Sequence, residues 1–95
     1  MEWTQDEAIA FECAREVITD MMAICTSQIS DESSKATLDT NRLAQLRIER
    51  SKLFRERATL HVADQSDIAR IRANYGAIVR AWREGHQAVV ATLIK

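Results

Sequence analysis

Proline is absent from this 95-residue chain, and glycine occurs only twice. These residues mark most tight turns and the ends of most strands, so their scarcity argues against a fold built from many short strands. Aromatic residues are scarce too, at 5% of the chain. The composition therefore favours an all-helical protein, which needs few turns.

Long hydrophobic runs are also missing. Hydrophobic residues make up 46% of the chain, yet the longest uninterrupted apolar stretch is only a few residues. A helix that spans a membrane needs about 20 consecutive apolar residues. The first residues, Met1 to Glu7, are acidic where a secretory signal is basic. We therefore expect a cytoplasmic protein with no membrane segment.

Only two cysteines occur, Cys13 and Cys25, and both fall within one expected helix. Twelve residues of helix separate them by about 18 Å, which is too far for a disulfide. We expect both thiols to be reduced, with a disulfide between two copies of the chain as the alternative.

The net charge is only −1, but the two parts of the chain differ in sign. Residues 1–41 carry nine acids against Arg15 and Lys35, a balance of −7, and residues 42–95 carry eleven bases against five acids, a balance of +6. This split suits an acidic helix packed beside a basic one, or an end of the protein that attracts nucleic acid.

The clearest pattern is an apolar stripe over residues 67–94, with steps of three and four residues. Its members are Ile68, Ile71, Tyr75, Ile78, Trp82, Gly85 and Val89, and it is widened by Val79, His86, Val90 and Leu93. This spacing predicts an amphipathic helix. Such a helix would be about 42 Å long, so other long helices or a partner must cover its stripe.

The first helix is expected over residues 4–28, beginning at a capping box formed by Thr4 and Glu7. Its apolar residues cover about half of the helix circumference, more than a simple three-helix bundle requires. We interpret the surplus as a sign of self-association or of a bound partner. A polar, serine-rich linker is expected over residues 29–38.

The second helix is expected over residues 39–61, with Asp39 as its N-cap. Arg50 and Arg57 interrupt a leucine seam in this helix, one heptad apart. Each guanidinium must reach water, a ligand or a carboxylate, and the acidic first helix is the natural source of carboxylates. With the third helix at 65–94, the sequence predicts a single domain: an elongated, antiparallel three-helix bundle, all-α, which dimerises through its long helices.

No arrangement typical of catalysis or metal binding is found. Glu12, Glu16 and Asp20 form an acidic ridge on one helix face, but a hard cation needs carboxylates from more than one helix. His86 has no Cys, Asp, Glu or His three or four residues onward, and Asp64, three residues after His61, is expected to cap the next helix. We therefore expect no enzyme activity, no metal and no cofactor.

We expect a protein-interaction module, an adaptor, inhibitor or regulator of bacterial or phage type, that forms a homodimer and binds another protein. The candidate partner-binding residues are Tyr75, Trp82, Arg50 and Arg57. The alternative is a nucleic-acid-binding regulator that uses the basic second helix. Its candidate residues are Arg42, Arg47, Lys52 and Arg55.

Overall fold

The computed structural model describes the backbone of residues 3–94 and the side chains of residues 3–86. It contains three helices: α1 (Gln5–Ser33), α2 (Thr40–Thr59) and α3 (Gln65–Ile94). No strand occurs in this part of the chain. The predicted all-α class and the order of three helices are confirmed, but α2, at 20 residues, is shorter than α1 and α3, at 29 and 30.

Local side-chain hydrogen bonds fix the starts of the first two helices. The hydroxyl of Thr4 accepts the backbone N–H of Glu7 at 3.1 Å, and the Glu7 carboxylate accepts the N–H of Thr4 at 2.9 Å. The Asp39 carboxylate accepts the N–H of Arg42 at 3.0 Å. These caps satisfy N–H groups that the first turn leaves without a partner inside the helix.

The helix ends differ from the expected ones. Helix α1 continues to Ser33, through half of the expected linker, so the connection to α2 is only 34–39. Here the hydroxyls of Ser33 and Ser34 donate to the carbonyls of Ile29 and Ser30, four residues back, at 2.8 and 2.9 Å. The hydroxyls thus bond along the helix rather than competing with it. Helix α2 ends two residues earlier than expected, at Thr59.

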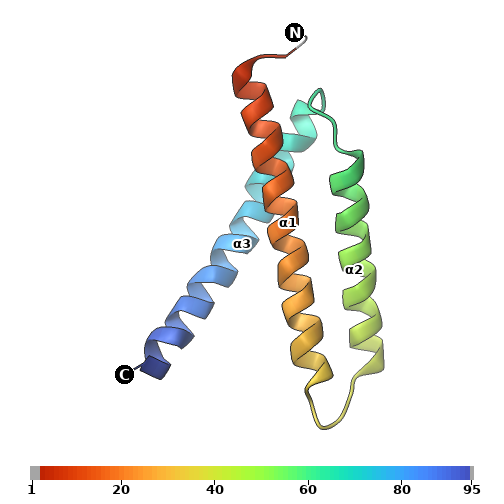
Figure 1. Ribbon diagram of the computed structural model, residues 1–95, viewed down its shortest axis with the longest axis vertical. Coiled ribbons are helices and arrows are strands. Elements are labelled where there is room, and N and C mark those ends of the chain that lie inside the picture. The colour runs from red at the N-terminus through yellow and green to blue at the C-terminus, as the bar shows by residue number, and fades with distance from the viewer. Residues whose placement is uncertain (1–2, 95) are drawn as a thin grey trace.

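Helix α1 lies between the other two helices and packs against both (Figure 1). Helix α2 runs antiparallel beside it, whereas α3 crosses α1 and then diverges from it (Figure 1). In the described part of the chain, α2 and α3 have no backbone packing contact of their own. The unit is elongated and flat, 54 × 35 × 15 Å, and α1 is the helix whose backbone packs closely against both of the others.

The core lies where the three helices meet. It is built from Ala14, Ile18, Cys25, Leu53, Ile68 and Ile71. Ile18, Ile68 and Ile71 have almost no exposed surface, so α1 and the first part of α3 form the centre of the core. No described helix is long and apolar enough to cross a membrane.

Candidate protein-interaction surfaces

The apolar stripe of α3 is buried only in part. Ile68, Ile71 and Val79 are buried, but Ile78 is 49% exposed and Trp82 is half-buried. Burial falls along α3 because the helix diverges from α1 (Figure 1). Gly85 and His86 are exposed, and the side chains of Val89, Val90 and Leu93 lie outside the described residues.

Trp82 stands at the point where α1 and α3 separate. It lines a hollow of about 220 Å³ together with Ile24 and Val79. The His86 ring stacks on the indole with 4.0 Å between ring centroids, and the His86 Nδ1 lies 2.9 Å from the Trp82 carbonyl oxygen. The next residue, Arg83, forms a 3.1 Å ion pair with Asp20 of α1. The Trp82 side chain is therefore held in place and left accessible, like the aromatic residues that contribute most of the binding energy at protein interfaces.

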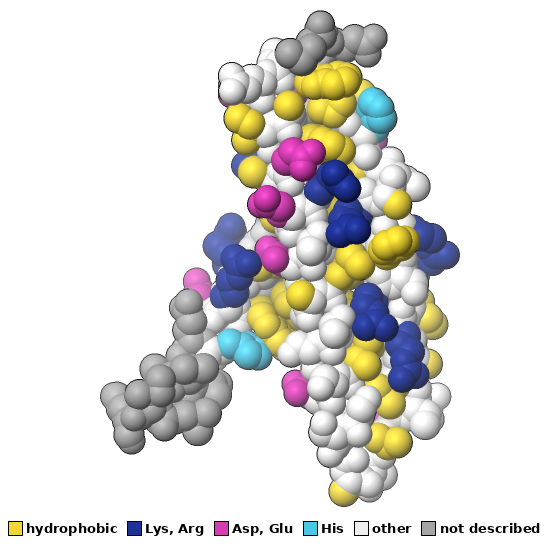
Figure 2. All heavy atoms as spheres, in the orientation of Figure 1, with side chains coloured by type: hydrophobic (Ala, Val, Ile, Leu, Met, Phe, Trp, Pro, Cys, Tyr) yellow, Lys and Arg dark blue, Asp and Glu magenta, His cyan; other side chains and the backbone are white. Residues whose placement is uncertain are grey.

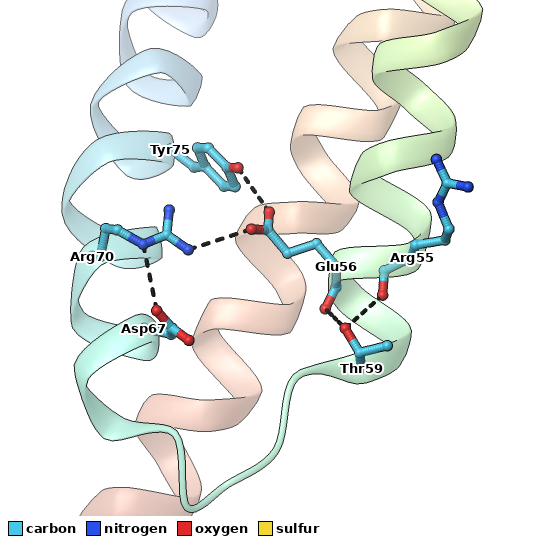
Figure 3. A network of polar contacts seen from close by, with 6 residues as sticks. All are labelled: Arg55, Glu56, Thr59, Asp67, Arg70 and Tyr75. Atoms are coloured by element: carbon cyan, nitrogen blue, oxygen red, sulfur yellow. Dashed lines mark hydrogen bonds and ion pairs between the residues drawn. The ribbon is translucent and has the colours of Figure 1, made fainter.

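Tyr75, the other aromatic candidate, belongs to a polar network that links α2 to α3 (Figure 3). Its hydroxyl donates to Glu56 Oε1 at 2.7 Å. The other carboxylate oxygen, Oε2, accepts from Arg70 at 3.4 Å, and Arg70 also lies 3.7 Å from Asp67. The hydroxyl of Tyr75 is thus used within the chain, and only its half-buried ring remains for a partner.

This network affects two ionisation equilibria. Burial, followed by the hydrogen bond to Glu56, raises the pKa of Tyr75. The same carboxylate raises the pKa of Arg70 by accepting its hydrogen bond. Both effects favour the protonated forms, the states in which Tyr75 and Arg70 donate to Glu56. Both donors therefore keep their protons at neutral pH.

The seam arginines contact threonines and not acids. Arg50 donates to Thr26 Oγ1 at 3.1 Å, and Arg57 donates to Thr19 Oγ1 at 3.0 Å. Each threonine hydroxyl also donates to a carbonyl of α1, four residues back, at 3.0 to 3.1 Å. The pairing with carboxylates of the first helix that the sequence favours is therefore wrong for the described residues.

These arginines border a groove between α1 and α2, which we call the arginine groove. It has a hollow of about 300 Å³, lined by Met22, Arg50, Ser51, Phe54 and Arg55. Arg57 extends the groove: its guanidinium lies 5.8 Å from the centre of the Phe54 ring, which is 53% exposed. Figure 2 shows pairs of basic side chains along this boundary, with hydrophobic side chains between them.

The residues proposed for nucleic-acid binding do not form one surface. Arg42, Arg47, Lys52 and Arg55 are exposed, but their positions are spread around α2. Lys52 lies 3.8 Å from Glu49 on the same helix, and Arg55 lines the arginine groove. A protein surface that binds a nucleic-acid duplex would place its basic side chains on one side of the helix.

The acidic ridge is partly neutralised inside the chain. Glu12 lies 3.9 Å from Arg15, and Asp20 is paired with Arg83. Among the residues that the structure describes, no group of three His, Cys, Asp or Glu side chains is placed to hold a metal ion. Cys13 and Cys25 are free, and burial raises the pKa of the Cys25 thiol, so this group stays protonated at neutral pH.

Sequence reasoning missed Thr19, Thr26, Met22 and Glu56. The threonines share one feature that could have revealed them: they are one heptad apart, as Arg50 and Arg57 are, so two antiparallel helices can align both pairs. Glu56 and Tyr75 lie on different helices, and no spacing rule relates them.

Comparisons of the chain with protein-family models, curated proteins and solved structures found no match. The function must therefore be argued from the residues themselves.

Replacing Arg50 or Arg57 with leucine should change the free energy of unfolding by no more than about 1 kcal/mol. The threonine hydroxyl that loses the arginine is uncharged, and it still donates its hydrogen bond to a carbonyl of α1. Thermal and urea denaturation measure this change. Loss of about 3 kcal/mol or more would show that each arginine balances a buried carboxylate.

Proposed function

We propose that the chain is a small helical protein-interaction module, an adaptor, inhibitor or regulator that acts by binding and not by catalysis. We further propose that it forms a homodimer through α3. The observation that carries this proposal is the half-exposed apolar stripe of α3, with Ile78 and Trp82 beside the place where α3 leaves α1. Exposed apolar patches of this kind on small proteins mark interaction sites.

The length and spacing of α3 support a second copy as the occupant. At about 1.5 Å per residue, α3 is about 45 Å long, and it diverges from α1, the helix against which it packs, so part of its apolar stripe is left uncovered (Figure 1). The stripe keeps heptad spacing from Tyr75 through Trp82 to Val89. Heptad-spaced apolar residues let two identical helices pack along a common seam, and a two-fold axis then uses the same patch on both copies.

The free cysteines agree with a reducing compartment, and we propose the cytoplasm. Nucleic-acid binding has less support. The basic residues of α2 are spread around the helix, so they do not offer a phosphate backbone one continuous basic face.

Trp82→Ser tests the proposed dimer. We expect this substitution to weaken self-association at least about thirtyfold, equivalent to about 2 kcal/mol, because buried tryptophans dominate interface energies. Light scattering over a dilution series gives the dissociation constant, and circular dichroism checks the fold.

Ile9→Ser is the matched control for Trp82→Ser, since Ile9 is a large apolar residue of α1 that is 52% exposed. The control should dimerise as the native protein does. If the two variants have equal dissociation constants for the dimer, an interface on α3 is contradicted.

A further inference from the structure

We infer that the arginine groove binds an acidic helical segment of a different protein, with carboxylates for Arg50 and Arg57 and an apolar side chain between them. The inference rests on the proposed function and names the chemistry of its partner. It concerns the surface between α1 and α2, which is separate from the α3 stripe.

The two guanidinium groups are held in matching positions. Arg50 and Arg57 are one heptad apart on α2, and their partners Thr26 and Thr19 are one heptad apart on α1. Two helical turns place the arginines about 10.5 Å apart along α2. Because a hydroxyl fixes each side chain before any ligand arrives, binding loses less side-chain entropy than it would with free arginines.

A threonine hydroxyl positions a guanidinium without neutralising it. Among the described residues, no carboxylate lies within ion-pair distance of Arg50, Arg55 or Arg57, whereas Arg70 and Arg83 each have one. Guanidinium groups bind carboxylates through parallel, charge-assisted hydrogen bonds, and each has donors beyond the one used by threonine. The groove is therefore prepared for an anionic ligand.

The space between these charges is apolar. Met22 and Phe54 line the hollow of about 300 Å³ together with Arg50 and Arg55. An anion such as free phosphate would leave these two side chains uncovered. A helix with acidic residues one heptad apart and a leucine between them presents all three side chains on one face. Its two carboxylates would then meet the two arginines, and its leucine would meet the apolar surface between them.

Two other occupants fit less well. A nucleic-acid duplex needs a row of basic side chains on one side, and the basic residues of α2 are spread around the helix. A second copy of the chain would offer its acidic ridge, but Glu12 and Asp20 already have basic neighbours in their own chain. Only Glu16 of that ridge would be free.

The test uses a fluorescent helical peptide with glutamates at positions i and i+7 and a leucine at i+4. A second peptide of the same composition has one glutamate moved to the opposite face. Fluorescence anisotropy should show binding of the first peptide to the native protein, and binding at least about tenfold weaker for the second.

The matched protein variants each remove two positive charges from α2. Arg50→Gln with Arg57→Gln should weaken peptide binding at least about tenfold, and Arg42→Gln with Lys52→Gln should change it less than about threefold. Phe54→Ser should also weaken binding, since it removes part of the apolar surface. Circular dichroism checks that each variant is folded.

The inference is overturned if the native protein does not bind the first peptide, if the two peptides bind equally, or if the two double variants lose equal affinity. Displacement of the peptide by a DNA duplex, with the same dependence on Arg50 and Arg57, would assign the groove to nucleic acid. Conversion of a native dimer to a monomer by the Arg50 and Arg57 double variant would assign it to a second copy. A dimer that depends on Trp82 but not on the groove would leave the proposed function intact and remove only this inference.

Discussion

Ile71→Ala is expected to lower the free energy of unfolding by about 3 kcal/mol, because it empties part of a tightly packed core. Ile71 has no exposed surface and lies in the core with Ile18 and Ile68, where α3 crosses α1. A domain of this size is stable by about 5–15 kcal/mol, so the loss is a large fraction of the total. Urea denaturation followed by circular dichroism measures it.

Ile48→Ala provides the comparison, since Ile48 is the same residue type in a helix but is 48% exposed. Its effect should stay below about 1 kcal/mol. If Ile48→Ala destabilises the protein as much as Ile71→Ala does, the packing of α3 on α1 is not as described.

Glu56→Ala should lower the free energy of unfolding by about 2 kcal/mol, because it leaves the Tyr75 hydroxyl and Arg70 without their shared acceptor. This carboxylate is the described polar link between α2 and α3, so its loss should also loosen the attachment of α3 (Figure 3). A double-mutant cycle with Tyr75→Phe should give a coupling energy of about 1 kcal/mol. A coupling near zero would contradict the contact.

The titration of Tyr75 gives a second check on the same contact. Tyr75 is the sole tyrosine, so the ultraviolet absorbance of tyrosinate reports this residue alone. Its pKa is raised by burial and by Glu56, so the folded state holds the proton more tightly than the unfolded state. The resulting stability is complete below the unfolded pKa of about 10 and is lost as pH rises through the folded pKa. Glu56→Ala should lower the midpoint in the folded protein.

The parts of the fold that sequence could predict depend on local interactions. The capping box of Thr4 and Glu7 and the Asp39 cap join residues three positions apart, and their spacing alone defines the geometry. The apolar periodicity likewise predicts Ile68 and Ile71 as buried residues. The end of α1 could not be predicted, because at Ser33 and Ser34 the same hydroxyl can stabilise or interrupt a helix.

The interhelical details could not be predicted. A helical pattern shows which residues share a face, but it does not set the angle or register between two helices. The divergence of α3 depends on that angle, and so does the exposure of Ile78. The contacts of Arg50 with Thr26 and of Tyr75 with Glu56 depend on register. These features produce both candidate interaction surfaces.

The mass of the native protein in solution tests whether the apolar stripe of α3 binds a second copy. Sedimentation equilibrium at micromolar concentrations should give about twice the chain mass of 10.8 kDa, with dissociation on dilution. A mass of 10.8 kDa that persists at the highest concentration reached would contradict a dimer formed through α3.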